Sequence, residues 1–251
     1  MDITEITDQL QFPEGPIAMP DGSVILVEIM RGTLSRVMPD GEIQVVAEPG
    51  GGPNGAAIGP DGHCYICNNG GFEWSRSSRG LIFPGNQASD YTTGRIERIN
   101  VETGVVEKLY TDCDGEPLKG PNDIVFDKEG GFWFTDHGKN RARDRDRTGV
   151  YYATVDGQHI VEAIFPMEAP NGIGLSPDEN TLYVAETPTG RLWAYALAAP
   201  GEIDRSQRPF MMAQIPDHHM FDSLAVDAEG NVCVATLING GITIHSADGE
   251  F

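Results

Sequence analysis

Five polar side chains recur at one position of a repeated pattern in this sequence. We call them the anchor residues: Glu14, Asn54, Asn122, Asn171 and Asp222. Carboxylate and amide oxygens are hard donors that suit Ca²⁺ or Mg²⁺, with Mn²⁺ as an alternative, whereas structural zinc is held by thiolates and imidazoles. If the anchor residues meet at one place, the sequence predicts an oxygen-lined site for a divalent cation. Such an ion can polarise a carbonyl or phosphoryl oxygen and acidify water.

Each anchor residue opens a segment that is typical of a β-hairpin. Seven positions later comes an acidic turn residue: Asp21, Asp61, Glu129, Asp178 or Glu229. Glycine follows in four of the five repeats, which is a strong signal for a tight turn. A short apolar run comes next: Val24–Val27, Cys64–Cys67, Phe132–Phe134, Leu182–Ala185 or Val232–Ala235. Short apolar runs bounded by turns indicate strands that are buried on both faces.

The repeat predicts an all-β fold, a β-propeller that forms a single domain over residues 1–251. Successive anchor residues are 40 to 68 residues apart, close to the length of a propeller blade. Five repeats are visible, and the fifth ends near Phe251 without a sixth anchor. We therefore expect a truncated chain or a divergent closure. Residues 3–10 are predicted to form an outer strand that closes the last blade, because open sheet edges are avoided.

Turn geometry predicts where the anchor residues lie. A hairpin returns the chain to its starting end, so each anchor is expected beside the last residue of the second strand. These partners are Glu28, Asn68, Asp136, Glu186 and Thr236. Two long loops, 69–93 and 137–148, follow at the same end, where binding is usually found. His137 is either a substrate contact or an exposed loop residue. A single Asn-Gly pair is more often a turn, but its recurrence at a fixed phase favours a site.

Composition narrows the classes of function. The net charge of −21 argues against nucleic-acid binding, which needs a basic surface. No apolar run reaches the length of a membrane span and no signal peptide is recognisable, so we expect a cytoplasmic protein without membrane contact. Cys64 and Cys67 are predicted on opposite faces of a strand, where they cannot bind the same metal ion. All four cysteines are expected in the core.

Four segments carry a more specific signal: FPEGP around Glu14, GPNDIVFDKEGGFWFTD, APNGIGLSPDENTLYVAET and FDSLAVDAEGNVCVA. Together they resemble the motifs of the SMP-30/gluconolactonase/luciferin-regenerating-enzyme (LRE)-like family. The resemblance implies a six-bladed propeller, whose final blade is incomplete in this chain. It also implies one divalent cation in the central tunnel, with Ca²⁺ as the first choice and Mg, Mn, Zn or Fe as alternatives. Glu14, Asn171 and Asp222 match metal ligands, Asn122 either joins the metal or holds substrate, and Asp222 matches the acid/base position.

The resulting hypothesis is a metal-dependent carboxylic ester hydrolase that opens a sugar-like lactone, as a gluconolactonase does. The ion would polarise the carbonyl, and Asp222 would act as the acid or base. Predicted substrate contacts are Asn122, Asn54, His137 and Asp136. Two alternatives stay open, a phosphotriesterase-like hydrolase using the same site and a non-catalytic propeller binding module. The expected partner is a small lactone, and the expected state is a monomer or weak homodimer.

Overall fold

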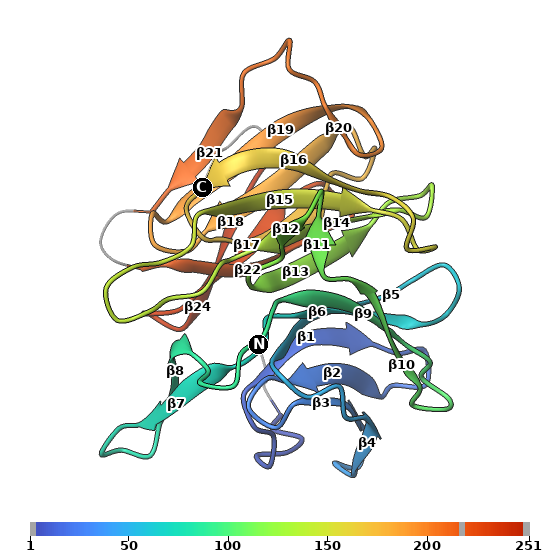
Figure 1. Ribbon diagram of the computed structural model, residues 1–251, viewed down its shortest axis with the longest axis vertical. Helices are drawn as coiled ribbons and strands as arrows, with labels where there is room; N and C mark the ends of the chain where they lie inside the picture. Colours follow the sequence, from blue (N-terminus) through green and yellow to red (C-terminus); the bar gives the residue numbers. More distant parts are fainter. Residues whose placement is uncertain (1–3, 216–218, 248–251) are drawn as a thin grey trace.

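The computed structural model describes residues 4–215 and 219–247, and all regular structure in these two ranges is β-strand apart from turns. Five antiparallel sheets follow one another in chain order, from blue to red in Figure 1, as the blades of a propeller. The predicted all-β propeller is confirmed. In each blade the strand that begins with the anchor segment lies innermost, and the later strands lie progressively farther out.

The blades are formed by consecutive parts of the chain. The first contains β1 (Pro13–Ala18), β2 (Val24–Glu28), β3 (Thr33–Val37) and β4 (Ile43–Ala47). The second contains β5 (Pro53–Ile58), β6 (Cys64–Asn68), β9 (Arg95–Ile99) and β10 (Val106–Tyr110). The third contains β13 (Pro121–Phe126), β14 (Phe132–Asp136), β15 (Thr148–Ala153) and β16 (Ile160–Met167). The fourth contains β17 (Pro170–Leu175), β18 (Thr181–Glu186), β19 (Arg191–Ala199), β20 (Glu202–Ile203) and β21 (Phe210–Gln214). The fifth contains β22 (Phe221–Val226), β23 (Val232–Thr236) and β24 (Gly241–His245).

Two short sheets lie outside the blades. The β7 (Phe72–Arg76) and β8 (Ile82–Gln87) hairpin interrupts the second blade between β6 and β9. The pair β11 (Asp112–Cys113) and β12 (Glu116–Pro117) connects the second blade to the third. The hairpin belongs to the long loop 69–93 that the sequence places near the anchor residues.

Apolar clusters between neighbouring blades hold the ring together. Consecutive residues of the second strands face opposite neighbours, which explains why these strands are continuous apolar runs. The four clusters contain, in order around the ring, Ile25 with Ile66, Tyr65 with Phe132, Trp133 with Leu182, and Tyr183 with Val234. Burial of each large apolar side chain contributes about 1.5–3 kcal/mol. The second strands therefore anchor the innermost strands on both sides.

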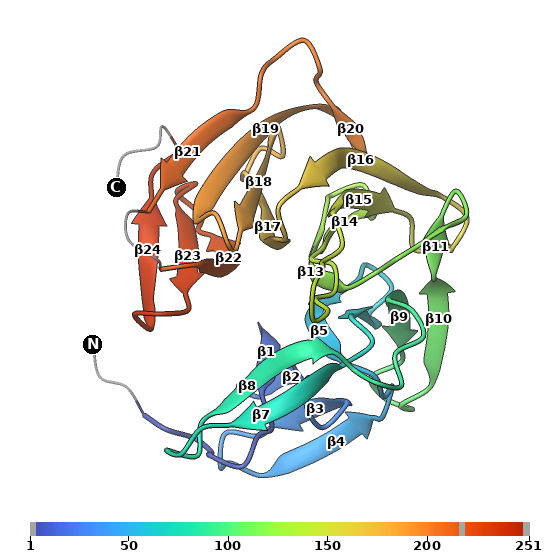
Figure 2. The ribbon, with the colours of Figure 1, turned by 60° about the vertical axis from the view of Figure 1, so that its left-hand side comes forward.

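The ring shows five blades in the described residues, and the fifth has only three strands. Figure 2 shows the arrangement open between β24 and β1. The outer strand predicted over residues 3–10 is wrong for its described part, because residues 4–10 form no strand. Ile242 and Ile244 are exposed on β24, and Ile242 lines the channel cavity.

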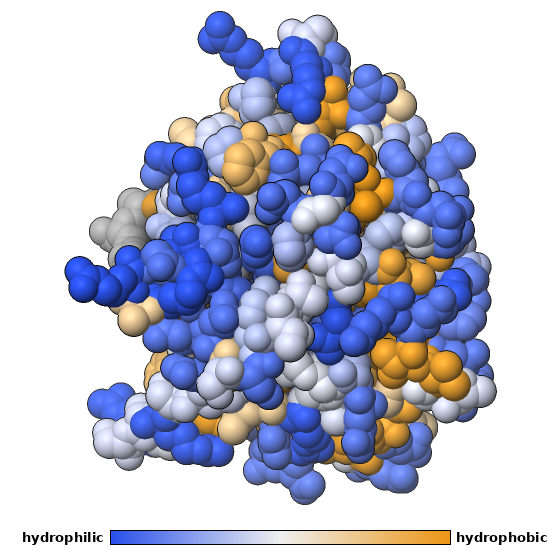
Figure 3. Space-filling model, viewed as in Figure 1, coloured by the Kyte–Doolittle hydropathy of each residue, from blue (hydrophilic) through white to orange (hydrophobic). Residues whose placement is uncertain are grey.

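The surface seen in Figure 3 is mostly hydrophilic, with scattered apolar patches, as expected from a net charge of −21. Within the described ranges, no helix is long and apolar enough to cross a membrane. The four cysteines are free, and Cys64, Cys67 and Cys113 are buried, as predicted for core residues. Cys233 is only partly buried and lines the channel cavity, so the prediction does not hold for it.

In four of the five blades the anchor residue is unpaired at a shift in register. The residue before each anchor pairs with the last residue of the second strand, as Pro121 pairs with Asp136, and the register shifts before the next pair. In β1, Glu14 itself pairs with Val27 and the shift follows it. The predicted pairing of the anchors themselves is therefore wrong by one residue. A bulge adds one residue to a strand and changes the direction of the side chains that follow it. The residue before the anchor therefore pairs with the last residue of the second strand.

Candidate metal and catalytic site

The anchor residues lie where neighbouring innermost strands approach closely. A Cβ atom on Gly172, which follows Asn171, would lie 2.5 Å from the backbone nitrogen of Leu224 and 2.7 Å from the carbonyl oxygen of Asp222. A Cβ on Gly55 would lie 2.3 Å from the carbonyl oxygen of Asn122. The glycines of these Asn-Gly pairs sit inside strands and permit close backbone packing. The turn interpretation of the pairs is therefore wrong.

Two anchor side chains are in direct contact. The Asn171 amide nitrogen donates to Asp222 Oδ1 at 2.7 Å and lies 3.1 Å from the Thr187 hydroxyl oxygen. Asn171 Oδ1 is buried and has no hydrogen-bond partner among the residues described. Because buried carbonyl oxygens are normally satisfied, this oxygen is free to bind a ligand such as a cation.

Carboxylates crowd the same region. Burial, together with the charges of Asp222 and Asp123, raises the pKa of Glu14 to about 8. Burial and then the charge of Asp222 raise the pKa of Asp123 to about 7, although a bond from the Ile124 backbone opposes this. Burial also raises the pKa of Asp222. The negative charges of the three carboxylates repel one another. Protonation or a bound cation would reduce this repulsion.

Asp123 is a functional candidate that sequence reasoning missed. It occupies the position that glycine takes after Glu14, Asn54 and Asn171. An acidic residue at this otherwise small position of the repeat was the signal that could have identified it. Its carboxylate interacts with Ser223, which follows Asp222 in the fifth repeat. The residues after the anchors thus add a second polar layer to the channel.

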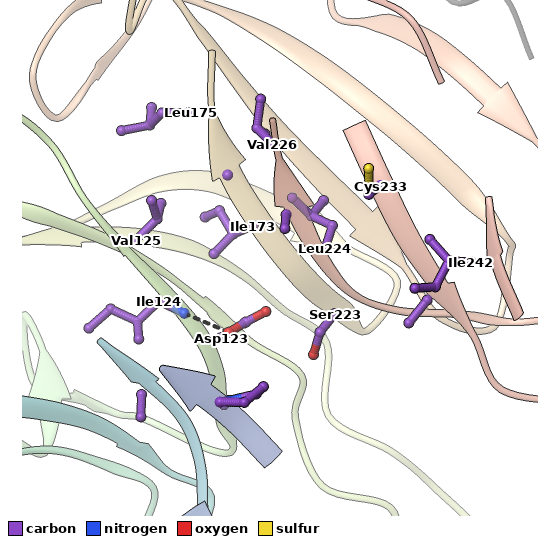
Figure 4. A pocket seen from close by; sticks show the side chains of 16 residues that line it. Asp123, Ile124, Val125, Ile173, Leu175, Ser223, Leu224, Val226, Cys233 and Ile242 are labelled. Atoms are coloured by element: carbon purple, nitrogen blue, oxygen red, sulfur yellow. Dashed lines mark hydrogen bonds between the residues drawn. The ribbon is translucent and has the colours of Figure 1, made fainter. Parts of the chain in front are cut away.

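A cavity of about 530 Å³ lies in the channel next to this group. Figure 4 shows Asp123 and Ser223 at one side, with Val125, Leu175 and Val226 farther along the innermost strands. The anchor side chains are not part of this lining, since they come one residue earlier on each strand. The cavity therefore combines a polar side near the anchors with an apolar remainder.

Asn54 and Asn122 are buried anchor residues that, in the described part of the chain, make no hydrogen bond to this group. Asn54 and Asn122 are each 8% exposed, and in the described ranges no side-chain hydrogen bond joins either to Glu14, Asn171 or Asp222. Their substrate-binding roles, and a metal-binding role for Asn122, stay predictions. Glu14, Asn171, Asp222 and Asp123 form the coupled set.

The residues that end the second strands hold the loops that lead to the anchors. Asp136 is fully buried and accepts hydrogen bonds from the backbone nitrogens of Lys119 at 2.7 Å, Gly120 at 2.8 Å and Gly138 at 2.8 Å. Glu28, Asn68 and Glu186 likewise accept bonds from the backbone nitrogens of Gln11, Gly52 and Glu168. These contacts occupy the Asp136 oxygens with backbone groups, and its predicted substrate contact stays a prediction.

We expect Asp136→Asn to lower the free energy of unfolding by about 3 kcal/mol, because an amide NH₂ cannot accept the backbone bonds that a buried carboxylate accepts. Urea unfolding measures the change. Asp144→Asn is the matched control on the same loop, since the Asp144 side chain is largely exposed and its ion pair with Arg141 lies at the surface. Unchanged unfolding of Asp136→Asn together with a raised KM would show that the carboxylate serves substrate instead.

His137 lies beside the fourth blade. Burial, with the charges of Arg145 and Lys139, lowers the pKa of His137 to about 4, and a hydrogen bond with the Pro170 backbone acts in the opposite direction. Its Nδ1 atom is buried and unpartnered within the described ranges. The ring is therefore neutral at pH 7 and can orient a polar group without adding charge.

The residues present fit a hard divalent cation. They offer carboxylate oxygens from Glu14 and Asp222 and the unpartnered amide oxygen of Asn171. No group of three His, Cys, Asp or Glu side chains in the described ranges is arranged to hold a metal by itself. A cation here would therefore depend on asparagine oxygen, which suits calcium better than zinc.

The raised pKa values predict a pH-dependent stability in metal-free protein. Asp123, with its pKa raised from 3.8 to about 7, favours the folded state at low pH, and this contribution is lost as pH rises through about 7. Asparagine cannot ionise, so Asp123→Asn avoids the free-energy cost of a buried negative charge. The free energy of unfolding of the variant, relative to that of the wild type, should therefore increase from about pH 5 to about pH 8. Thermal unfolding in chelator measures this difference. A difference that does not change with pH would contradict the coupling.

Comparison with known proteins identifies a family. The model described as the SMP-30/gluconolactonase/LRE-like region matches residues 12–251. A gluconolactonase of Zymomonas mobilis is 25% identical, covering 99% of this chain and 70% of that protein. The lactonase drp35 of Staphylococcus saprophyticus is 30% identical, covering 98% and 70%, and that of Staphylococcus aureus strain MRSA252 is 28% identical, covering 91% and 64%. The chain thus spans about two thirds of the length of these relatives.

Solved structures agree in fold. A gluconolactonase from Xanthomonas campestris superposes with a TM-score of 0.75 at 23% identity, covering 98% of this chain and 76% of that one. The calcium-binding protein regucalcin from Agrobacterium tumefaciens gives a TM-score of 0.74 at 20% identity, covering 98% and 74%. At these identities the likeness shows the propeller fold.

Proposed function

Because this chain belongs to the SMP-30/gluconolactonase/LRE-like family, we propose that it hydrolyses a lactone with the help of a divalent cation. The observation that carries the proposal is the coupled set at the channel end. There Asn171 leaves a buried oxygen unpartnered, beside two carboxylates whose negative charge the site disfavours. The relatives named gluconolactonase and lactonase support the choice of a lactone.

Glu14, Asn171 and Asp222 would hold the ion, and calcium is the first choice because every donor is oxygen. The similarly folded calcium-binding regucalcin supports that choice. When bound, a divalent cation would polarise the lactone carbonyl and stabilise the negative charge that develops on its oxygen. Asp123 adds a further carboxylate near the ion, where it would strengthen cation binding through charge alone.

Asp222 is the proposed general base. The Asn171 amide donates to its Oδ1 atom at 2.7 Å and the Ser223 backbone also donates to the carboxylate, which fixes the group that would accept a proton from water. The water oxygen then bonds to the carbonyl carbon, and the ring carbon–oxygen bond breaks. Asp222 returns the proton to the ring oxygen, which yields a hydroxy acid. Burial raises the pKa of Asp222, which makes the carboxylate a stronger base than an exposed aspartate.

The substrate is proposed to be a small lactone whose ring enters the channel. The cavity of about 530 Å³ is large enough for such a molecule and has its polar side near Asp123 and Ser223. Asn122 and Asn54, both nearly buried at the start of their strands, are the proposed contacts for ring hydroxyl groups. The neutral His137 ring is the proposed orienting group on the neighbouring loop.

A panel of aldonolactones, simple aliphatic lactones and an aryl phosphotriester tests this function. We expect turnover of at least one lactone with calcium, magnesium or manganese present, and its loss in chelator while the far-UV circular dichroism stays unchanged. Turnover of the phosphotriester alone would favour the phosphotriesterase-like alternative. No turnover on any substrate, with the cation measurably bound, would favour a binding module.

A further inference from the structure

Lys139 is a buried lysine that the proposed mechanism does not use. Burial lowers the pKa of its amino group to about 7, although the charges of Asp136 and Asp146 act in the opposite direction. Lys139 is 1% exposed, although lysine is rarely buried without a reason. Its Nζ atom donates to the carbonyl oxygen of Gly71 at 2.6 Å and to Asn69 Oδ1 at 3.2 Å. The same atom lies 3.9 Å from the centre of the Phe72 ring. The ammonium is thus held by two oxygens and an aromatic face.

These contacts join two loops from different blades. Asn69, Gly71 and Phe72 lead into β7 from the second blade, whereas Lys139 follows β14 of the third. A backbone bond from Gln87 nitrogen to Asn140 oxygen, at 2.8 Å, holds the other strand of the same hairpin. Both strands of the β7–β8 hairpin are therefore attached at their base to the loop that carries Lys139.

The β7–β8 hairpin also contacts the segment that precedes Glu14. The Trp74 ring lies 5.9 Å from the Phe72 ring and 5.0 Å from the Phe12 ring, measured between centroids. Phe12 precedes Glu14 by two residues and has a φ of 58°, a conformation that non-glycine residues rarely adopt. A continuous series of contacts thus runs from Lys139 to the segment that presents Glu14. In Figure 2 the hairpin lies in front of the first blade.

We propose that Lys139 is a positioning residue for the lactone site, because it fixes the β7–β8 hairpin so that Trp74 forms a wall of the channel mouth beside Glu14. The inference rests on the proposed function for its kinetic consequence, but the hairpin's attachment can be tested without activity. Lys139 itself faces Phe72 and the loop oxygens, so it acts through the hairpin and not on substrate.

Hydrogen–deuterium exchange of the wild type, Lys139→Met and Lys139→Arg tests the attachment. Methionine keeps the length and loses the hydrogen-bond donors. We expect the amides of residues 72–87 to exchange about tenfold faster in Lys139→Met, because losing the two hydrogen bonds of Nζ lowers the local opening free energy. Exchange in β13, β17 and β22 should not change, and Lys139→Arg should restore most of the protection.

Steady-state kinetics on the best lactone of the panel tests the positioning role. Lys139→Met and Trp74→Ala should each raise KM about fivefold with kcat nearly unchanged. The lost contacts would bind the substrate and the transition state equally, so their loss weakens binding and does not slow the chemical step. Phe72→Leu removes the ring beneath the ammonium and should give the same pattern in weaker form, so it replaces Lys139→Met if that variant does not fold.

Unchanged hairpin exchange in Lys139→Met, or in Phe72→Leu if the former does not fold, would overturn the attachment. Faster exchange with unchanged KM would overturn the positioning role, and a large fall in kcat at constant KM would show that Lys139 acts in the chemistry. If the wild type shows no lactonase activity, the proposed function fails, whereas the exchange result still decides the attachment.

Discussion

Replacing Asp222 with asparagine is expected to lower kcat for lactone hydrolysis by about 10³-fold, because the variant keeps the shape and loses the proton acceptor. The Asn171 amide donates to Asp222 Oδ1, and an asparagine oxygen can still accept this bond. The innermost strands should therefore keep their packing. Stopped-flow or pH-indicator assays at saturating calcium measure the change, and calorimetric titration shows whether the ion still binds.

Asp123→Asn is the matched control, since its carboxylate lies in the same channel and is coupled to Asp222. It should weaken calcium binding and reduce kcat by no more than about tenfold at saturating ion, as expected for a charge that does not transfer a proton. Full activity of Asp222→Asn with calcium bound would exclude Asp222 as the base. An equal fall in kcat in the two variants would mean that Asp222 acts only through its negative charge and not as the proton acceptor.

Replacing Gly172 with alanine is expected to cost about 3 kcal/mol of unfolding free energy, because an added methyl would overlap the backbone of β22. Its Cβ would lie 2.5 Å from Leu224 nitrogen and 2.7 Å from the carbonyl oxygen of Asp222. Neither backbone atom can rotate away as a side chain can. For a chain of this size the melting temperature should fall by about 10 °C.

The same substitution should also reduce kcat/KM by about 100-fold in the protein that remains folded, since a displacement of about 1 Å can have this effect on a reacting group. Gly241→Ala is the control, because a Cβ there meets its nearest atom, Thr236 Oγ1, at 3.5 Å, an ordinary contact. A stable and fully active Gly172→Ala would show that the close approach of β17 and β22 is not needed.

Much of the fold was predictable from local patterns. The acidic turn and the apolar run after each anchor identify a hairpin without knowledge of its neighbours, and the buried runs match β2, β6, β14, β18 and β23. The bulges were not predictable, because they lie in the innermost strands, whereas the continuous apolar runs that identify the hairpins lie in the second strands. That shift of one residue moved Asp136 from beside Asn122 to beside Pro121.

The site was predictable in kind and less so in detail. Repetition at a fixed phase identified the five anchor residues, and the family resemblance selected Glu14, Asn171 and Asp222 among them. The structure couples these three through one hydrogen bond and their charges. The repeat marks Asp123 as unusual, but its partners Asp222 and Ser223 lie far along the chain, and local spacing does not encode such a contact. Two of the three backbone hydrogen bonds to the Asp136 carboxylate likewise come from residues 16 and 17 positions earlier in the chain.

The most direct test of a cation-dependent lactonase at this channel is lactone hydrolysis by chelator-treated wild type to which calcium is returned. We predict that activity is absent in chelator, returns in proportion to the calcium bound at one site per chain, and does not return in Glu14→Gln at the same calcium concentration. Undiminished hydrolysis by the metal-free protein, or equal recovery in Glu14→Gln, would contradict the account.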